Sequence, residues 1–302
     1  MVKVAEINSF LRKGYVDFRY KGEESVTINT MSNLKELVDH SICWIKTKKY
    51  ASETVIKKIQ SHEQVLVVCP FEIDGVNCII TDYPKGVFFS ILNEFFYHSF
   101  NHGISDKATL LTSEIGSNVH IGANCYIGED VKIGDNTIIH PNVSIIAPCT
   151  IGHDCVIFPG VVIGADGFGY YVEDDIPYHE KHFKGVVIGD YVDIGANTCI
   201  DRGLLTDTTI CNHVKIDNLC HIGHNVRIEE NCMIIAGTII CGSAVIGRNS
   251  YLAPDSVVLN QIKIGEKAVL GVNSAAIIDV KAGVTAFGTP AKRLSPHNRN
   301  HN

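Results

Sequence analysis

Hydrophobic residues recur at every sixth position over most of the chain. Nine isoleucines spaced six residues apart run without a break from Ile115 to Ile163, and the spacing returns from Ile188 to Ile200 and from Ile210 to Leu270. A helix face repeats about every 3.6 residues and a half-buried strand about every 2 residues, so neither explains this pattern. A strict spacing of six with β-branched residues is typical of a short-repeat β-solenoid.

The other positions of the repeat indicate a parallel β-helix. Glycine often follows the repeated residue, as at Gly122 and Gly134, where we expect a turn to use its freedom at positive φ. Four positions after the repeated residue the side chain is small or β-branched, as at Val119 and Cys125. If both kinds point inward, each unit forms one flat side of a coil, and three units close a triangular turn around a packed aliphatic axis. The twenty-three repeated positions supply nearly eight coils.

Two segments interrupt the repeat, and we expect both to leave the β-helix as loops. The longer one, between Ile163 and Ile188, contains the stretch GFGY at 167–170 and a charged stretch at 173–184, which is too polar for a packed axis. The shorter one spans residues 202–209. Long loops on rigid scaffolds often carry function, and a tolerated insertion explains these two equally well.

The first hundred residues lack the six-residue spacing and are expected to form a separate α/β domain. Residues 51–60 have helical spacing, and an aromatic-rich helix is predicted over residues 87–97, after Pro84. Compact β-rich runs stand at residues 65–69 and 78–81. We therefore expect an N-terminal domain, a β-helix domain and a C-terminal tail, with the bounds 1–100, 101–288 and 289–302.

Composition and charge argue against several classes of protein. The chain has 302 residues, of which 45% are hydrophobic, and a net charge of −7 without a basic run longer than residues 46–49, so we expect no nucleic-acid binding. No stretch reaches the roughly 18 apolar residues of a membrane span, and the N-terminus lacks a signal-peptide core, so we expect a cytoplasmic protein. At least five of the eleven cysteines hold the small inward position, which predicts reduced core thiols without a metal or redox role.

His224 is the strongest candidate for chemistry. Ile222 and Val226 are expected to point inward, which puts His224 on an outward or corner position. Imidazole is suited to accept a proton near neutral pH, although most surface histidines have no such role. The His-x-x-His spacing of His221 and His224 crosses a corner of the prism, so we expect no metal ion there.

Around His224 the sequence resembles the hexapeptide-repeat acyltransferases. The stretches GADGFGY at 164–170, TCIDRG at 198–203 and IDNLCHIGHNV at 216–226 are similar to the UDP-3-O-(3-hydroxyacyl)glucosamine N-acyltransferases of lipid A biosynthesis. The resemblance covers most of the chain, to about residue 288. It implies a left-handed β-helix, a homotrimer with active sites between adjacent prisms, and His224 as the general base.

The chemistry implied by this resemblance is the transfer of an acyl group to nitrogen. His224 would remove a proton from a sugar amine while the nitrogen attacks an acyl thioester carried by acyl carrier protein or coenzyme A. Asp217 and Asn218 would orient the sugar or the imidazole, and capping of a solenoid turn explains them equally well. Gln261 stands where the family commonly has a second histidine, which makes it a further candidate for substrate binding. No metal and no permanently bound cofactor are expected.

A second candidate site lies in the N-terminal domain. Trp44, Thr47 and Tyr50 align with a family segment in which two aromatic residues sandwich the uracil of a nucleotide and an asparagine bonds its edge. Trp44 and Tyr50 match the aromatic residues, and Thr47 replaces the asparagine. Stacking on a pyrimidine is worth about 1–3 kcal/mol per base, and thymine would stack as well as uracil. Without the resemblance, a core role for Trp44 is the simpler interpretation.

The stretch GTPAKRL at 288–294 leaves the acyl donor open. It resembles the end of small coenzyme A-dependent hexapeptide acetyltransferases rather than the C-terminal helices of lipid A enzymes. We therefore expect an N-acyltransferase for a UDP-linked amino sugar, as in lipid A biosynthesis. The alternative is a coenzyme A-dependent N-acyltransferase for a UDP- or dTDP-amino deoxysugar of a surface polysaccharide. A non-catalytic or zinc-binding trimeric β-helix is the alternative from another class.

Overall fold

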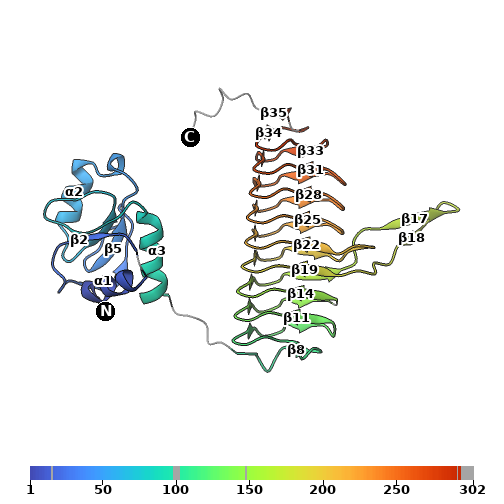
Figure 1. Cartoon of the computed structure of the whole chain (residues 1–302), viewed down its shortest axis with the longest axis horizontal. Helices are drawn as coiled ribbons and strands as arrows, with labels where there is room; N and C mark the ends of the chain where they lie inside the picture. Colours follow the sequence, from blue (N-terminus) through green and yellow to red (C-terminus); the bar gives the residue numbers. More distant parts are fainter. Residues whose placement is uncertain (15, 98–102, 147, 291, 294–302) are drawn as a thin grey trace. The chain divides into compact units, whose positions relative to one another are not determined.

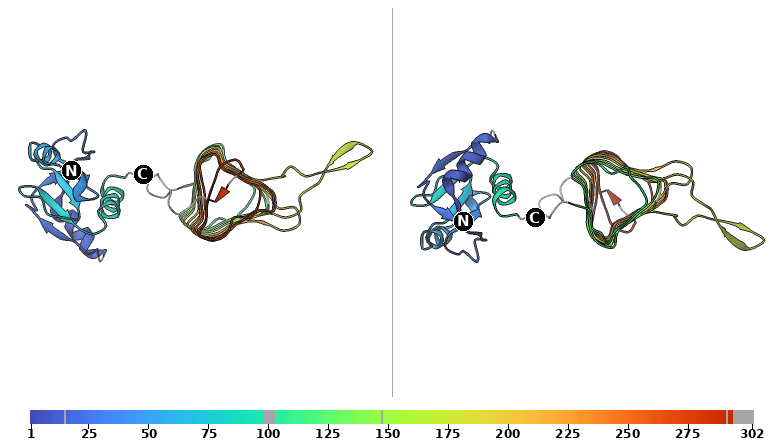
Figure 2. Two further views of the ribbon diagram at one scale, coloured as in Figure 1. Left: turned by 90° about the horizontal axis from the view of Figure 1, so that it is seen from above. Right: turned by 90° about the horizontal axis from the view of Figure 1, so that it is seen from below.

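The six-residue repeat forms a parallel β-helix with a triangular cross-section (Figures 1 and 2). The chain divides into two units, Met1–Phe100 and Asn101–Asn302, and the β-helix belongs to the second. This structure, a computed structural model, describes residues 1–14, 16–97, 103–146, 148–290 and 292–293. Its strands are short because each occupies one side of the triangle before the chain turns a corner.

Each side of the triangle is a sheet of stacked strands. Face 1 has nine parallel strands: β8 (Thr109–Leu110), β10 (Tyr126–Ile127), β13 (Ser144–Ile145), β16 (Val162–Ala165), β21 (Cys199–Asp201), β24 (His221–Ile222), β27 (Ile239–Ile240), β30 (Val257–Val258) and β33 (Ala275–Ala276). Face 2 has seven parallel strands: β11 (Val131–Ile133), β14 (Cys149–Ile151), β19 (Val186–Ile188), β22 (Thr208–Ile210), β25 (Arg227–Ile228), β28 (Val245–Ile246) and β31 (Lys263–Ile264). Face 3 has ten strands, of which the last is antiparallel: β9 (His120–Ile121), β12 (Ile138–Ile139), β15 (Val156–Ile157), β20 (Asp193–Ile194), β23 (Lys215–Ile216), β26 (Met233–Ile234), β29 (Tyr251–Leu252), β32 (Val269–Leu270), β34 (Thr285–Phe287) and β35 (Lys292–Arg293).

The β-helix is longer than the isoleucine spacing predicts. Within the described residues, face 1 stacks nine strands, whereas the spacing predicts nearly eight coils. The additional strands are β8, which precedes Ile115, and β33 and β34, which follow Leu270. Alanine replaces the large aliphatic residue at Ala276 and Ala286, which are nevertheless buried, so the sequence pattern fades before the coils end.

Isoleucines of successive coils stack directly on one another. Ile127 pairs with Ile145, and Ile145 pairs with Ile163, and all three are fully buried. The inward cysteines are buried as well, and burial raises the pKa of Cys149 to about 12 and the pKa of Cys155 to about 11. These thiols are therefore protonated near neutral pH, and they pack as small apolar side chains.

The glycines of the repeat allow close approach between coils, and the predicted positive φ at Gly122 and Gly134 is wrong. The left-handed corner positions fall two residues later, at Asn124 and Asn136, with φ of 60° and 58°. A Cβ on Gly122 would lie 2.5 Å from the backbone nitrogen of Pro141 in the next coil. Glycine is needed for space, and asparagine tolerates the left-handed backbone at the corner.

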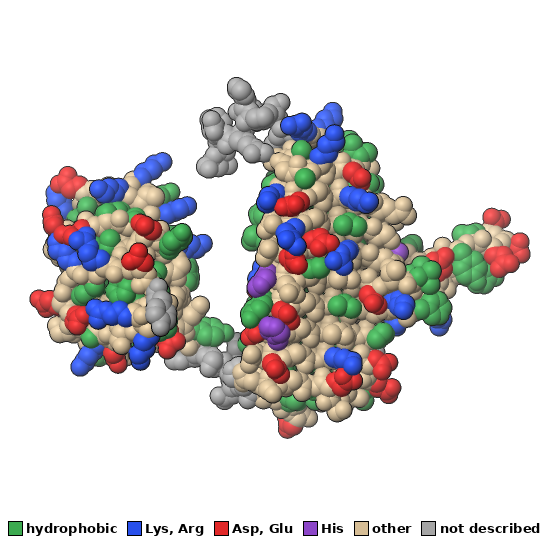
Figure 3. Space-filling model, viewed as in Figure 1, with side chains coloured by type: hydrophobic (Ala, Val, Ile, Leu, Met, Phe, Trp, Pro, Cys, Tyr) green, Lys and Arg blue, Asp and Glu red, His purple; other side chains and the backbone are tan. Residues whose placement is uncertain are grey.

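Both interruptions of the repeat leave the β-helix. The longer one contains the antiparallel strands β17 (Tyr170–Glu173) and β18 (Ile176–His179), which form a hairpin projecting from the coils (Figure 1). All residues of these two strands are exposed. Figure 3 shows hydrophobic side chains along the hairpin and acidic side chains at its tip.

The N-terminal unit contains a five-stranded sheet with helices on both faces. The strand order is β2 (Arg19–Lys21), β7 (Asn77–Ile80), β6 (Leu66–Cys69), β5 (Ser41–Trp44) and β4 (Thr30–Met31), with β2 antiparallel to its neighbour and the other pairs parallel. The other elements are β1 (Val2–Lys3), β3 (Thr27–Ile28), which pairs with β1, α1 (Val4–Lys13), the short 3-10 helix η1 (Lys48–Tyr50), α2 (Glu53–Gln60) and α3 (Pro84–Phe95).

Helices α1 and α3 pack on one face of this sheet, and α2 packs on the other. Ile7 of α1 and Ile91 of α3 share a buried cluster with Val68 of β6. Ile59 of α2 belongs to a second cluster with Val67. Because successive side chains of a strand point to opposite faces, β6 contributes to both clusters. Helices near residues 51–60 and 87–97 and strands near 65–69 and 78–81 occur as predicted, whereas α1 and β5 were not predicted.

The sequence also gives expectations about membrane spans, the C-terminal tail and the surface charge. Among the described residues, no helix is both long enough and apolar enough to cross a membrane. Most of the predicted tail, residues 291 and 294–302, lies outside the described residues. On the side of the molecule seen in Figure 3, basic and acidic side chains are interspersed.

Candidate active site

Both interruptions of the repeat leave the β-helix at the same corner, between faces 1 and 2. The longer loop leaves after β16 and returns in β19, and the shorter loop leaves one coil later, after β21, and returns in β22. His224 and Asn225 follow β24 at this corner in the next coil. The stacking of coils therefore brings two loops and the candidate histidine together, although they are far apart in the sequence.

Hydrogen bonds join the two loops beside this corner. The N–H of Lys184, in the longer loop, donates to the carbonyl of Gly203, in the shorter loop, at 3.0 Å. In return, Nε of Arg202, in the shorter loop, donates to the carbonyl of Lys184 at 2.6 Å. The N–H of Leu204, in the shorter loop, donates to Oδ1 of Asn225 at 3.2 Å. The shorter loop is thus bound on one side to the longer loop and on the other to the coil that carries His224.

The orientation of Asn225 determines which nitrogen of His224 carries a hydrogen. Nδ2 of Asn225 donates to the carbonyl of Thr206 at 2.7 Å, and a carbonyl can only accept. Oδ1 of Asn225 therefore faces Nδ1 of His224 at 2.8 Å, and Nδ1 must be the donor. In the neutral ring this leaves Nε2 without a hydrogen and with its lone pair available. The network sets His224 to accept a proton at Nε2.

Two glycines leave the room in which the His224 ring lies. Gly242 occupies the same corner one coil further on, and a Cβ there would lie 2.6 Å from Nε2 of His224. A Cβ on Gly167, in the longer loop, would lie 3.0 Å from Cδ2 of the same ring. The imidazole therefore lies close to the next coil and to the loop, where a larger residue at either glycine would displace it.

A buried carboxyl group and further histidines surround His224. The ring centroid of His182, in the longer loop, lies 5.3 Å from that of His224 with an interplanar angle of 80°. Oδ2 of Asp201 lies 3.5 Å from Nε2 of His221. Burial raises the pKa of Asp201, while His221, His224 and His182 act in the opposite direction. Clustered titratable groups with a shifted pKa are typical of functional sites.

The sequence pattern identifies His224 but not the contribution of His182 and Asp201. Asp201 stands in the TCIDRG stretch, directly after the buried Ile200, so its place at the end of a strand was a usable signal. His182 belongs to the polar stretch that interrupts the repeat. Its position beside His224 depends on how the loop folds back, and residue spacing does not reveal that.

Asp217 and Asn218 lie at the preceding corner of the coil, between faces 3 and 1. Oδ1 of Asp217 accepts from the N–H of Asn218 at 2.7 Å, and Oδ2 accepts from the N–H of Ala236 at 3.2 Å. Oδ1 of Asn218 accepts from the N–H of Ala196 at 2.6 Å. Both side chains therefore bond the backbone of turns in their own and neighbouring coils, as the capping interpretation expects, and a role in sugar binding stays a prediction.

Gln261 lies at the corner of His224, two coils further on. It is exposed, its φ is 63°, and its N–H donates to the carbonyl of Gly242 at 3.1 Å. Gly242 thus separates its backbone from the coil of His224. A role of the Gln261 side chain in substrate binding stays a prediction.

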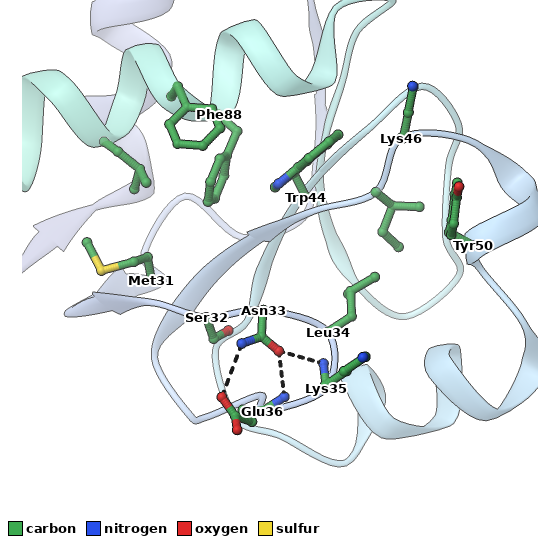
Figure 4. A pocket seen from close by; sticks show the side chains of 13 residues that line it. Met31, Ser32, Asn33, Leu34, Lys35, Glu36, Trp44, Lys46, Tyr50 and Phe88 are labelled. Atoms are coloured by element: carbon green, nitrogen blue, oxygen red, sulfur yellow. Dashed lines mark hydrogen bonds between the residues drawn. The ribbon is translucent and has the colours of Figure 1, made fainter. Parts of the chain in front are cut away.

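The N-terminal unit has a pocket of about 950 Å³ that contains both predicted aromatic residues. Trp44 and Tyr50 line it together with Phe88 of α3 (Figure 4). The ring centroids of Trp44 and Phe88 lie 6.4 Å apart, and the rings are tilted by 34°. Trp44 packs against the core cluster below α3 and also borders the pocket, so the core interpretation and the binding interpretation both describe part of its surroundings.

The structure does not bring Thr47 into the contacts of this pocket. Thr47 is exposed, precedes η1 and is not among the lining residues. Asn33 lines the pocket instead, and the sequence pattern did not identify it. Its Oδ1 accepts from the N–H groups of Lys35 and Glu36 at 2.8 and 2.9 Å (Figure 4). The side chain of Asn33 is therefore held in place by the turn that it stabilises.

Comparisons with known proteins agree with the repeat and the fold. Residues 112–147 and 130–165 match the family described as bacterial transferase hexapeptide (six repeats). The chain is 42% identical over 151 residues to the probable UDP-3-O-acylglucosamine N-acyltransferase 2, mitochondrial, of Arabidopsis thaliana, which covers 50% of this chain and 49% of that protein. It is 45% identical over 160 residues to the UDP-3-O-acylglucosamine N-acyltransferase of Maricaulis maris, covering 53% and 46%. The matches thus span about half the length of these curated relatives.

Solved structures with the same architecture include two acyltransferases. The UDP-N-acetylglucosamine acyltransferase from Campylobacter jejuni superposes with a TM-score of 0.58 at 23% identity, covering 66% of this chain and 79% of that chain. LpxA from Acinetobacter baumannii gives a TM-score of 0.57 at 25% identity, covering 63% and 73%. These likenesses confirm the predicted left-handed parallel β-helix, and the structure itself contains the small α/β unit of the predicted fold class. The relatives confirm the resemblance to hexapeptide-repeat acyltransferases.

Proposed function

We propose that this chain, which resembles the UDP-3-O-acylglucosamine N-acyltransferases, transfers an acyl group from a thioester to the amine of a UDP-linked amino sugar, as in lipid A biosynthesis. The observation that carries the proposal is the hydrogen-bonded state of His224. Asn225 accepts the hydrogen of Nδ1, so Nε2 is the proton acceptor at a corner that also carries two loops. A general base needs this combination of a fixed tautomer and a reachable lone pair.

In the proposed step, the amine nitrogen of the sugar attacks the carbonyl carbon of the thioester. Nε2 of His224 takes the proton that the nitrogen loses, and the negative charge on the carbonyl oxygen is stabilised by backbone N–H groups of the coil. The tetrahedral intermediate then expels the thiolate, which takes the proton from the imidazolium. The nitrogen–carbon bond forms and the carbon–sulfur bond breaks, so the neutral base is restored.

The N-terminal pocket is proposed to bind the pyrimidine of the nucleotide sugar. A flat ring stacked on Trp44 or Tyr50 would fill part of the cavity, and Lys35 and Lys46 at its border have the charge to meet the diphosphate. Thr47 has no part in this arrangement. Asn33, which lines the pocket, is proposed to meet the edge of the base instead, and this revises the residue set expected from the sequence.

The active form is proposed to be a homotrimer with each site between adjacent prisms. Outward side chains on face 3 offer apolar surface for such packing: Met233 and Tyr251 are neighbours in register and are 47% and 38% exposed. Cyclic symmetry would give each His224 the same neighbour. Sedimentation velocity should give three chains per particle, and a fully active monomer would contradict the shared site.

Mass spectrometry of the product is the direct test of the reaction. A panel of acyl carrier protein and coenzyme A thioesters, offered with UDP- and dTDP-linked amino sugars, should give one N-acylated nucleotide sugar. His224→Ala should lower kcat by about 10²–10⁴-fold while leaving sugar-nucleotide binding unchanged. His213→Ala is the matched control, because His213 is exposed and stacks on Tyr191 at another corner. Normal turnover in His224→Ala would remove His224 from the mechanism.

The donor and the compartment follow from the same experiment and from cell fractionation. Transfer from coenzyme A to a dTDP-amino deoxysugar would favour the surface-polysaccharide alternative over lipid A. Because nucleotide sugars and acyl thioesters are used in the cytoplasm, we propose that the chain acts there. Recovery of the chain with the membrane or the periplasmic fraction would contradict this location.

A further inference from the structure

Three potential metal ligands meet at the base of the projecting hairpin. Asp166 precedes β17, His179 ends β18, and His182 follows it. One ligand atom from each side chain lies within 4.8 Å of the other two, and Nε2 of His179 lies 3.9 Å from Oδ2 of Asp166. In a tetrahedral zinc site, bonds of about 2.0–2.2 Å separate the ligand atoms by roughly 3.3–3.6 Å. Side-chain shifts of about 1 Å would therefore close the cluster around an ion.

One ring nitrogen of His182 is free to bind a ligand. The residue is 5% exposed, and its Nδ1 lies 3.0 Å from the carbonyl oxygen of Glu180. A carbonyl can only accept, so Nδ1 carries the hydrogen and Nε2 presents a lone pair. Nε2 is buried and has no hydrogen-bond partner among the residues that the structure describes. Buried polar atoms nearly always have a partner, and a carbonyl on the second nitrogen is the usual arrangement of a metal-binding histidine.

We propose that Asp166, His179 and His182 bind a divalent transition-metal ion, with Zn²⁺ as the expected ion. Two imidazoles and one carboxylate are a ligand set that Zn²⁺ accepts, whereas Ca²⁺ and Mg²⁺ prefer oxygen ligands alone. Three protein ligands leave the fourth tetrahedral position to water. This proposal departs from the expectation, based on His221 and His224, that the chain has no metal site.

The buried carboxylate of Asp201 would support the charge of the ion. A Cβ on Gly167 would lie 3.0 Å from Nε2 of His182 and 3.1 Å from Oδ2 of Asp201, so both atoms border the same small space. Together with Asp166, Asp201 supplies two carboxyl groups near a doubly charged ion. Asp201 is not one of the three residues whose ligand atoms lie within 4.8 Å of one another, so we treat it as a neighbour rather than a ligand.

The ion would join the two ends of the hairpin. Asp166 lies before the hairpin, and His179 and His182 lie at its end, so one ion closes the segment at its base. The same ion would hold His182, whose ring centroid is 5.3 Å from that of His224. Metal binding at this cluster does not depend on the proposed acyl transfer and is measured without substrate.

Calorimetric titration of the full chain with Zn²⁺ alone tests the site. After a chelator has been used and removed, the wild-type chain should bind one ion per chain at a saturable site. His179→Gln and His182→Gln should each weaken binding by more than tenfold, because loss of even an outer-shell partner costs about 10–100-fold. His213→Gln is the control and should bind as the wild type does, since His213 lies at another corner.

Thermal unfolding gives a second measurement that does not rely on heats of binding. Zn²⁺ should raise the Tm of the wild type and of His213→Gln, but not of either ligand variant, because an ion that binds only the folded chain stabilises it. His179 is exposed, so His179→Gln keeps the test valid if His182→Gln does not fold. Wild-type affinity in a folded ligand variant, or no saturable binding to the wild type, would overturn the proposal. If the wild-type chain binds zinc but transfers no acyl group, only the proposed function would be contradicted.

Discussion

Replacement of Gly242 by alanine tests whether the position of the His224 ring matters for catalysis. The added Cβ would lie 2.6 Å from Nε2 and 2.8 Å from Cε1, whereas ordinary contacts begin near 3.4 Å, so the ring must move by about 0.8 Å. The backbone of Gly242 is not left-handed, so alanine adds no strain there. The change therefore acts on the ring rather than on the fold.

The magnitude follows from the required movement. A misplacement of about 1 Å at a reacting group can cost about 10²-fold in rate, which corresponds to about 2.7 kcal/mol in the activation barrier. Because the bond between Nδ1 and Asn225 is 2.8 Å long, movement of the ring also weakens the interaction that fixes its tautomer. We expect kcat of Gly242→Ala to fall by about 10²-fold, with little change in the affinity for the sugar nucleotide.

Initial rates of thioester consumption and a thermal melt separate a displaced ring from a damaged fold. Gly86→Ala is the control, because a Cβ at that position of α3 meets no atom of the described residues within 4 Å, and its rate should equal that of the wild type. A folded Gly242→Ala variant with unchanged kcat would show that the geometry around Nε2 does not limit the reaction. The assignment of His224 as a closely positioned base would then be wrong.

Three further predictions concern the pocket, the core and a surface histidine. Trp44 is the only tryptophan, so a pyrimidine nucleotide that binds the pocket should quench the intrinsic fluorescence of the chain. Tyr50→Ala should weaken this binding by about 1–3 kcal/mol, whereas Thr47→Ala should not. If Tyr50→Ala bound the nucleotide as tightly as the wild type, stacking on Tyr50 would be refuted. Ile145→Ala, in a fully buried column, should lower the free energy of unfolding by about 2–5 kcal/mol. Ile146→Ala, at a neighbouring position that is 38% exposed, should lower it by about 0.5 kcal/mol or less. Chemical denaturation measures both values, and similar losses would contradict the inward assignment of Ile145. The hydrogen bond to Asp154 raises the pKa of His153 in the folded chain. The stabilising contribution of this bond is therefore fully present below the pKa of the unfolded chain and is lost as pH rises through the pKa of the folded chain. Asp154→Asn should lower the pKa of His153 in an NMR titration, and an unchanged value would exclude Asp154 as the cause.

The sequence predicts the β-helix well because one packing constraint repeats in every coil. Ile145, for example, lies between the buried Ile127 and Ile163 of the adjacent coils. If the isoleucine were shifted by one position, a gap would open between these two residues, so packing keeps the spacing constant. The same reasoning fails where the constraint relaxes, as at Ala276 and Ala286, where smaller side chains still pack but no longer mark the repeat. It also misassigned glycines such as Gly122 and Gly134, because spacing alone does not distinguish a demand for positive φ from a demand for space.

The surroundings of the candidate site could be predicted only in part. The outward position of His224 can be inferred directly from the sequence, because the residue lies between two inward residues of a regular coil. His182 comes from a segment without a repeat, and only the folding of that segment puts its ring beside His224. Asn33 in the N-terminal pocket was missed for a similar reason, since it lies in a turn without periodic spacing that borders the same pocket as Trp44. Thr47 is a different case, because alignment with a family segment does not guarantee a place in the lining of the cavity.

The position of β21 in its sheet has a consequence for local unfolding. β21 is the fifth of nine strands on face 1, and the strands that carry the rest of the corner, β16 and β24, are its immediate neighbours. In a solenoid each coil is stabilised by the coils on either side, so fraying begins at the ends and reaches the middle last. Backbone amides around Asp201 and His224 should therefore exchange with deuterium more slowly than those of β8 or β33. The corner at which we propose the reaction lies in the part of the stack that thermal fraying should disturb least.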